Sequence, residues 1–283
     1  MSYKYNPQKY RKTYRWLRGK ISKKSCSKMT PERFQEIDKL YHYTSLKNGL
    51  LILLSRTMIM SHPSKMNDIN ESYRPIYCSL ENDIEKVEKE IKKYYQSSFT
   101  LDDGKTPGFF IPAMWGHYAD KGYGVCIVFD RKKLISRIES YGYCYDKVRY
   151  NENYDSSILV EGNPQKYIRE HINNVFFTKS KDWSYEREYR VICRSNVEPV
   201  EIDISDCIVA VIVNNFKDID CNEQQTNSPT YKALIHKLRG SDIPVLLLNM
   251  APLNGEYELV NYESDTNGEI WYPKQSKIID IDI

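Results

Sequence analysis

Four separated groups of polar and aromatic residues carry side chains suited to ligand chemistry. Histidine, glutamate and tyrosine can move protons or hold hydroxyl groups, and aromatic rings can stack on planar ligands. The groups are Tyr41-His42-Tyr43-Thr44, Asn67-Asp68, Trp115-Gly116-His117-Tyr118 and Glu186-Arg187-Glu188-Tyr189-Arg190. The sequence therefore predicts a binding face assembled from segments that lie far apart along the chain.

The last group places two glutamates beside an arginine. Side chains alternate between the faces of a strand, so Glu186, Glu188 and Arg190 would project from the same face. Two neighbouring carboxylates raise each other's pKa, and an adjacent arginine lowers it again. Such an array is costly to bury unless it binds something polar. From the spacing alone, an ion-pair ladder on the protein surface is an equally good interpretation.

The first group could bind a phosphate or a ribose, whereas the second is typical of a turn. His42 lies in an expected short strand, and Thr44 and Ser45 stand at the start of an expected helix, where hydroxyl and backbone donors are available. A lone histidine is nevertheless more often structural than catalytic. Asn67-Asp68 is typical of a turn, and it joins the site only if the fold brings it close.

The third group could bind a flat, positively charged ring such as nicotinamide, through stacking and cation–π attraction. Trp115 and Tyr118 precede an expected central strand, although Trp115 could equally be a core anchor. Gly122 and Gly124 do not complete a dinucleotide fingerprint, because no third glycine follows at the right offset. The GxxxxGK[ST], HExxH and GxSxG patterns are also absent from the sequence.

Short strands and irregularly placed helices must position these groups. The pattern fits an α+β fold with a compact mixed or antiparallel β core and flanking helices better than a βαβ repeat. Helices are expected at residues 30–38, 46–54, 81–95, 132–139, 163–175 and 231–238. Strands are expected at residues 40–44, 57–61, 76–80, 125–129, 144–150, 188–193, 207–213, 244–248 and 256–260, with 125–129 in the centre of the sheet.

The composition is that of an ordinary soluble globular protein, with 41% hydrophobic and 28% charged residues. No apolar run is long enough to span a bilayer, and no secretion signal is expected. The seven cysteines are irregularly spaced and include no CxxC, which favours reduced thiols in a cytoplasmic protein over a disulfide framework or a zinc site. No metal is expected in the site.

Residues 1–29 are expected to form a basic arm, and residues 30–283 a single α+β domain. Between Lys4 and Lys28 the chain has ten lysines and arginines and no acidic residue, with aromatic residues interleaved. Such a segment could contact the phosphates of a nucleic acid. We favour the alternative, a solvated arm or a helix packed on the domain through its aromatic face.

The order of these groups resembles a bacterial family catalogued as domain of unknown function 2971 (DUF2971). The similar segments cover about residues 40–195, and those that contain tryptophan are the more specific ones. They are residues 40–44, 61–71, 114–120, 124–130 and 181–190. The layout also resembles the ADP-ribosyltransferase superfamily, which has a histidine on an early strand, a tyrosine in a middle block and a Glu-x-Glu pair on a late strand.

The second resemblance implies an NAD-consuming ADP-ribosyltransferase or NAD glycohydrolase, acting as a bacterial or phage toxin or defence effector. In that family the histidine holds the ribose and adenine side of NAD, the tyrosine stacks on nicotinamide, and the last glutamate bonds the ribose 2′-hydroxyl. Here these roles fall on His42, Tyr118 and Glu188, with Glu186 orienting an acceptor. The residues expected to contact NAD are His42, Tyr43, Thr44, Asn67, Trp115, Tyr118 and Arg190.

Two other classes of function stay open. One is a non-catalytic module that binds a nucleotide or a nucleic acid, the latter through residues 1–28. The other is a metal-free nuclease that uses His42, His117 and the glutamates. The acceptor of the transferase would be a protein or a nucleic acid. All of these proposals need an imidazole, an aromatic ring and an acidic pair to converge around one pocket.

Overall fold

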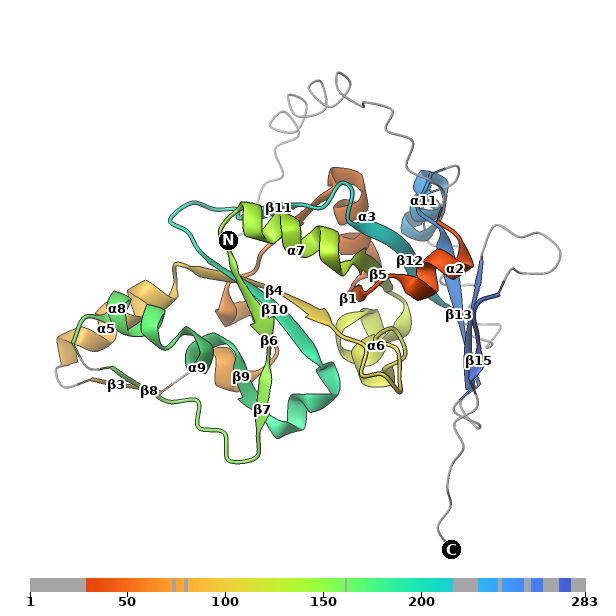
Figure 1. Cartoon of the computed structure of the whole chain (residues 1–283). Coiled ribbons are helices and arrows are strands. Elements are labelled where there is room, and N and C mark those ends of the chain that lie inside the picture. Colours follow the sequence, from red (N-terminus) through yellow and green to blue (C-terminus); the bar gives the residue numbers. More distant parts are fainter. Residues whose placement is uncertain are drawn as a thin grey trace, which may run out of the picture.

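The computed structural model describes residues 29–72, 75–78, 81–160, 162–215, 229–238, 241–251, 256–261 and 270–275 (Figure 1). Apart from Met29, the expected basic arm lies outside the described residues, so the predicted division into arm and domain stays a prediction. No helix in the described part of the chain is long and apolar enough to cross a membrane. The cysteines among the described residues are free thiols.

A nine-stranded sheet forms the centre of the fold. Its neighbouring strands run antiparallel except β12 and β13, which are parallel. From one edge to the other, the order is β15 (Ile270–Gln275), β14 (Glu256–Asn261), β13 (Val245–Ala251), β12 (Ile208–Asn215), β5 (Val125–Asp130), β1 (Lys39–Thr44), β4 (Tyr94–Thr100), β10 (Glu188–Arg194) and β6 (Cys144–Lys147). The predicted mixed, mostly antiparallel α+β architecture is confirmed.

Helices cover both faces of this sheet, and each face has its own hydrophobic core (Figure 1). One core is formed with α3 (Leu46–Ser55), α7 (Arg131–Ser140) and α11 (Pro229–Leu238). The core on the opposite face is formed with α2 (Pro31–Glu36) and α6 (Pro112–Tyr118). The predicted central strand, β5, lies between the two cores, and residues 125–129 are fully buried because every side chain in this run is apolar.

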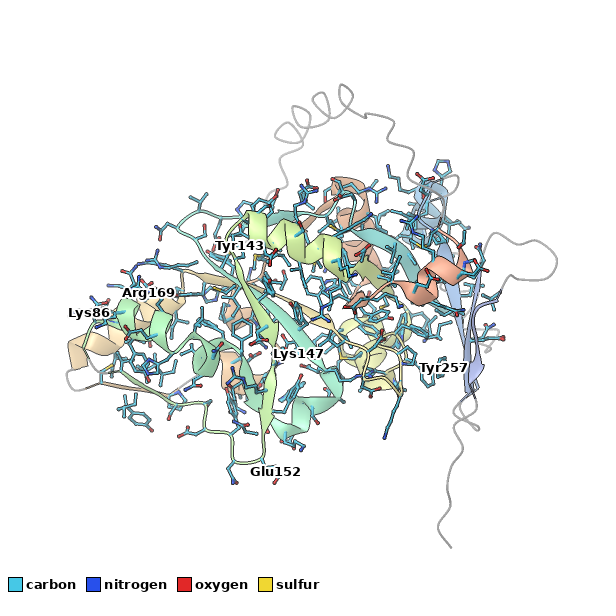
Figure 2. All side chains as sticks on the ribbon, in the orientation of Figure 1. Lys86, Tyr143, Lys147, Glu152, Arg169 and Tyr257 are labelled. Atoms are coloured by element: carbon cyan, nitrogen blue, oxygen red, sulfur yellow. The ribbon has the colours of Figure 1, made fainter. Side chains whose placement is uncertain are left out.

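A third hydrophobic cluster lies beyond one end of β4 and β10. It is formed by α5 (Glu81–Ile91), α8 (Pro164–Glu170) and α9 (Ile172–Phe176), together with the strand pair β3 (Ile76–Cys78) and β8 (Ile158–Val160). Charged side chains such as Lys86 and Arg169 lie on the outside of this end (Figure 2).

Shorter elements complete the fold around the site. They are β2 (Thr57–Ile59) paired with β11 (Glu201–Asp203), β7 (Arg149–Asn151) paired with β9 (Thr178–Ser180), the helix α4 (Ile69–Ser72), and the 3-10 helices η1 (Pro63–Lys65), η2 (Asp120–Gly122) and η3 (Lys181–Glu186).

Capping residues fix the helices nearest to the site. The Ser45 side chain accepts a hydrogen bond from the backbone N–H of Asn48 and begins α3, as the sequence predicts. Asp130 begins α7 in the same way, through the backbone N–H of Lys133. The ends of β1 and β5 are therefore continued by helices that start at defined residues.

Three sequence predictions about local structure are wrong. The helix predicted to reach residue 95 ends at Ile91, and the chain then forms the unpredicted strand β4. Glu186 ends the 3-10 helix η3 instead of lying in the strand with Glu188. The segment predicted as one strand at residues 144–150 is split between β6 and β7.

Candidate functional site

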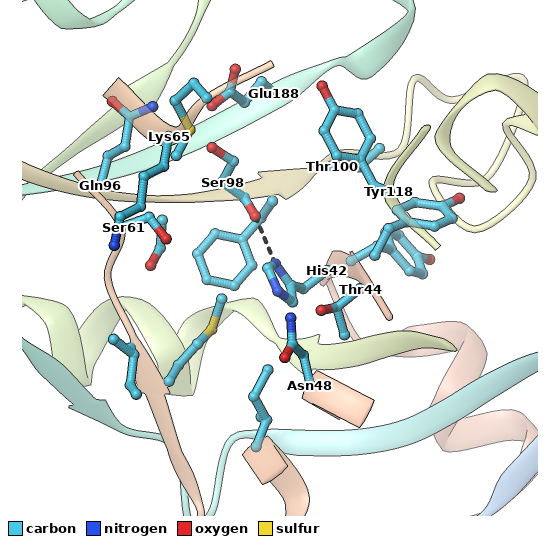
Figure 3. A pocket seen from close by; sticks show the side chains of 18 of the residues that line it. His42, Thr44, Asn48, Ser61, Lys65, Gln96, Ser98, Thr100, Tyr118 and Glu188 are labelled. Carbon is cyan, nitrogen blue, oxygen red and sulfur yellow. Dashed lines mark hydrogen bonds between the residues drawn. The ribbon is translucent and has the colours of Figure 1, made fainter. Parts of the chain in front are cut away.

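A cavity of about 550 Å³ lies where β1 and β4 part. β1 pairs with β5 along its whole length, and β4 pairs with β10 along its whole length. In contrast, β1 and β4 pair only at Tyr41 and Thr100. Beyond that pair, both strands line the cavity (Figure 3). Its volume is in the range of pockets that hold small molecules and cofactors.

His42 spans the gap between the two strands. Its Nδ1 lies 3.0 Å from the backbone carbonyl oxygen of Ser98 on β4 (Figure 3). Because a carbonyl only accepts, Nδ1 must carry the proton. Burial lowers the pKa of His42, with the Ser98 carbonyl opposing part of that effect, so the ring is neutral at pH 7. Its Nε2 is then an acceptor for a ligand hydroxyl group.

The cavity brings together seven of the residues predicted from the sequence to form the site. His42, Tyr43 and Thr44 come from β1, and they meet Asn67, Tyr118, Glu186 and Glu188 from three later segments. His42 and Glu188 thus share one cavity, although 146 positions separate them along the chain. The Tyr43 hydroxyl donates to the carbonyl of Gly108 at 2.7 Å, so this ring is fixed in the wall.

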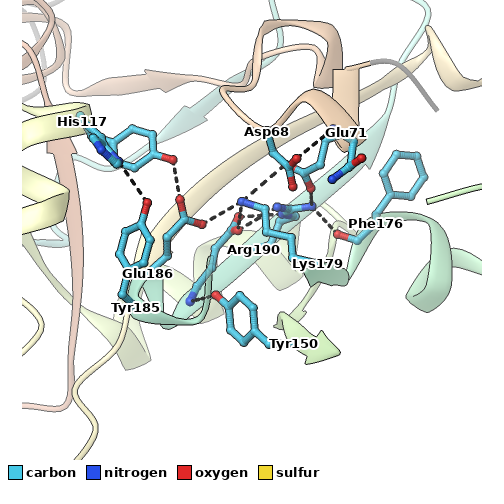
Figure 4. A network of polar contacts seen from close by, with 12 residues as sticks. Asp68, Glu71, His117, Tyr150, Phe176, Lys179, Tyr185, Glu186 and Arg190 are labelled. Atoms are coloured by element: carbon cyan, nitrogen blue, oxygen red, sulfur yellow. Dashed lines mark hydrogen bonds and ion pairs between the residues drawn. The ribbon is translucent and has the colours of Figure 1, made fainter. Parts of the chain in front are cut away.

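One lysine connects the acidic groups at the end of this cavity. The Lys179 ammonium lies 2.8 Å from Glu186, 3.0 Å from Glu188 and 3.5 Å from Glu71 (Figure 4). It also lies over the ring of Trp183. All four charged side chains are buried. Lys179 therefore fixes the relative positions of three carboxylates, all of which line the cavity.

Arg190, which does not line the cavity, binds two of these carboxylates. Its Nε and Nη2 donate to the two oxygens of Glu188 at 2.7 and 2.8 Å. Its Nη1 donates to Glu71 and to the backbone carbonyl of Phe176, both at 2.5 Å (Figure 4). The side chain is 0% exposed and is not among the cavity-lining residues. Arg190 is placed to orient Glu188 and does not itself reach a ligand in this cavity.

The backbone at Arg187 turns the two glutamates toward the same network. Arg187 adopts a left-handed conformation with φ of 47°, which is unfavourable for a residue other than glycine. Its side chain holds this turn through the carbonyl of Thr106 at 2.6 Å and an ion pair with Asp103 at 2.9 Å. Convergence of Glu186 and Glu188 thus results from this turn and not from the alternation of a strand.

The environment gives the two glutamates opposite proton affinities. Burial would raise the pKa of Glu188, but Arg190 and Lys179 hold that pKa well below its ordinary value of 4.5. Burial raises the pKa of Glu186 above 4.5, with Lys179 opposing and Glu188 adding to the shift. Tyr118 donates a hydrogen bond to Glu186, and burial beside that carboxylate raises the pKa of the phenol. Of the two carboxylates, Glu188 is therefore the more acidic and Glu186 the one that binds a proton more readily.

Two of the expected NAD contacts do not reach this cavity. Trp115 is 2% exposed, lies in the core against Tyr43, and donates from its indole nitrogen to the carbonyl of Phe109 at 2.9 Å. Trp115 is therefore not among the cavity-lining residues, and neither is Arg190. Their expected contacts with NAD stay predictions that the lining of this cavity does not support. Tyr118 is the last residue of α6, and it lines the cavity.

The sequence analysis missed several residues of this site. Lys179, Gln96 and Ser98 line the cavity but belong to none of the four predicted groups. Glu71 lies three residues after Asp68, where it could join the Asn67-Asp68 group, and within the segment 61–71 that resembles the family. Lys179 lies between the buried aromatic pair at 176–177 and the half-buried Trp183, but the exposed Lys181 lies in the same interval, so the sequence does not distinguish the two lysines.

A model of a family described as "Protein of unknown function (DUF2971)" matches residues 114–191 of the chain. The match supports the resemblance to this family. It includes the similar segments at 114–120, 124–130 and 181–190, and it leaves residues 40–71 outside. No curated protein and no solved structure matches the chain in the corresponding comparisons. The residues that match include Tyr118, Lys179 and both glutamates of the candidate site.

Proposed function

We propose that this protein cleaves the bond between nicotinamide and ribose in NAD, as an ADP-ribosyltransferase or an NAD glycohydrolase. The observation that carries the proposal is that His42, Tyr118, Glu186 and Glu188 line one cavity large enough for a small molecule. The ADP-ribosyltransferase resemblance gives these residues complementary roles toward NAD. No metal ion takes part in the proposed reaction.

The charges of the site suit the bond that breaks. When the bond between the ribose C1′ and the nicotinamide nitrogen breaks, its electron pair leaves with nicotinamide and the sugar becomes oxocarbenium-like. Glu188, an anion whose orientation is fixed by Arg190, would accept a hydrogen bond from the ribose 2′-hydroxyl and stabilise the positive charge. The neutral His42 would accept a hydrogen bond from a second ribose hydroxyl through Nε2.

Glu186 has the properties of the proton acceptor in the second step. Water or an acceptor group attacks C1′ and loses a proton as the new bond forms. A carboxylate whose pKa is raised by burial is a stronger base than an exposed one, and the Tyr118 hydroxyl holds it in position. Glu186 would take that proton, which agrees with the role expected for it in orienting the acceptor.

The test is release of nicotinamide from NAD by the purified full-length chain, followed by chromatography. We expect Glu186→Gln to reduce the rate by about 100-fold or more. Glu170→Gln, a change at an exposed glutamate of α8 outside the cavity, should leave the rate unchanged. Circular dichroism and melting curves show whether each variant is folded. Tyr118→Phe provides a second variant, since it keeps the ring and removes only the hydroxyl group.

The outcomes separate clearly. Loss of nicotinamide release in Glu186→Gln, with an unchanged melting curve, supports the proposal. A wild-type protein that neither releases nicotinamide nor melts at a higher temperature with NAD contradicts it, because a ligand that binds only the folded state raises stability. Nucleic-acid binding through residues 1–28 falls on residues outside the described part of the chain and stays a prediction.

A further inference from the structure

The cavity contains a buried amide donor that has no hydrogen-bond partner among the described residues. Gln96 on β4 is 2% exposed, and its Nε2 donates no hydrogen bond to any described residue. The residue lines the cavity (Figure 3). Leaving a buried amide N–H group unpaired is costly, and such groups usually have a protein, water or ligand partner. This donor therefore indicates an acceptor group on a ligand.

Two further donors stand beside it. Ser61 and Gln96 exchange backbone hydrogen bonds of 2.8 and 2.7 Å, which fixes the segment of Ser61 on β4. Lys65, at the end of the 3-10 helix that follows, is exposed and lines the same cavity. It makes no ion pair with any residue that the structure describes. The amide of Gln96, the hydroxyl of Ser61 and the ammonium group of Lys65 thus belong to residues that line the same cavity.

Ser98 relates the position of Gln96 to that of Glu188. Ser98 pairs with Arg190 on the neighbouring strand and helps to lower the pKa of Glu188, and Ser98 and Gln96 project from the same face of β4 two residues apart. Two residues of a strand span about 7 Å. This is close to the length of one ribose with its 5′ carbon. A ribose held at Glu188 would place its 5′ substituent at Gln96.

We infer that Gln96, Ser61 and Lys65 form a subsite for the phosphate groups of a nucleotide. The carboxylates that line the cavity, Glu71, Glu186 and Glu188, all pair with Lys179. Lys65 has no such ion pair among the described residues, and lysine is a common phosphate ligand. The inference rests on the proposed function for the position of the ribose. It adds a binding site for the phosphate groups of the same ligand.

The test measures binding of two probes, ADP and adenosine, to the full-length chain by isothermal titration calorimetry. We expect ADP to bind at least about tenfold more tightly than adenosine, with an affinity that falls as salt is raised, because lysine–phosphate attraction is screened. Lys65→Ala and Gln96→Met should each weaken ADP at least about fivefold and change adenosine little. Methionine has nearly the shape of glutamine and lacks the donor, so the fold should be kept. Lys47→Ala is the control, since Lys47 is exposed on α3 and does not line the cavity.

Equal affinities for ADP and adenosine, or no binding of either, would overturn the subsite. So would unchanged ADP binding in both Lys65→Ala and Gln96→Met. The result also separates this inference from cleavage of NAD. Binding of ADP that depends on Lys65, in a protein that releases no nicotinamide, leaves the subsite standing and refutes the cleavage. Nicotinamide release with an unchanged KM for NAD in both variants refutes the subsite alone.

Discussion

Replacing Arg190 by methionine tests whether the buried network holds the site together. The guanidinium donates two hydrogen bonds to Glu188, one to Glu71 and one to a backbone carbonyl, and none of its surface is exposed. Methionine fills similar space but leaves two buried carboxylates with Lys179 as their remaining cation. Breaking a buried ion pair by removing one partner costs about 3–5 kcal/mol. In a chain of this size, that loss lowers the melting temperature by roughly 10 °C.

The dependence of this loss on pH identifies its cause. In the wild type the pKa of Glu188 is depressed in the folded state, so this group contributes stability above its unfolded pKa of about 4.3, and the contribution is lost as the pH falls below that value. Without Arg190 the buried carboxylate is protonated more easily. The difference in unfolding free energy between wild type and Arg190→Met should therefore be larger at pH 7 than at pH 4.

Urea denaturation at both pH values measures this difference. Arg194→Met is the matched control on the same strand, because Arg194 pairs with Glu90 at 2.5 Å but keeps 31% of its side chain exposed. The unfolding free energy of Arg194→Met should be less than about 1 kcal/mol below that of the wild type. A loss for Arg190→Met no greater than that of the control, or one independent of pH, would refute the view that Arg190 compensates buried carboxylates.

Two further predictions concern the site. Nicotinamide release should fall as the pH is lowered through the pKa of Glu186, which burial raises above 4.5, because only the ionised carboxylate accepts a proton. If the residual activity of Glu186→Gln falls at low pH in the same way as the wild-type activity, this assignment is contradicted. Trp115→Phe should destabilise the fold by about 1–3 kcal/mol, since it leaves a buried carbonyl without its donor, and should leave the KM for NAD unchanged. Melting curves and steady-state kinetics measure the two effects. A raised KM for NAD would indicate that Trp115 contacts the ligand.

The sequence predicts an element well where all of its buried side chains are apolar. Residues 125–129 have only apolar side chains, and they form the central strand, because a strand covered on both faces requires such a run. β4 escapes prediction for the opposite reason. Gln96, Ser98 and Thr100 on one face are polar and line the cavity, and Ser97 interrupts the aromatic residues of the other face. The strand therefore lacks the alternation of hydrophobic and polar residues that a half-buried strand shows.

Residue type alone identifies part of the site. His42, Tyr118, Glu186 and Glu188 are found because imidazole, phenol and paired carboxylates are unusual in such short runs. Lys179 is not found, since a lysine between polar residues resembles a solvated surface residue. Its burial depends on the pairing of β7 with β9 and on packing beside Trp183, both of which require the folded chain.

The cost of the network is itself an argument that it binds something. Hydrophobic residues of similar volume in place of a buried group of charges often leave stability unchanged or raise it, so stability alone does not account for such a group. Here three carboxylates and two cations are buried together, and Arg187 is held in an unfavourable backbone conformation. With all five groups ionised, the network carries one net negative charge toward the cavity. A ligand that becomes positively charged as it reacts would be stabilised by that charge. Protonation of Glu186 would remove it, so activity and the proton affinity of one side chain should change together.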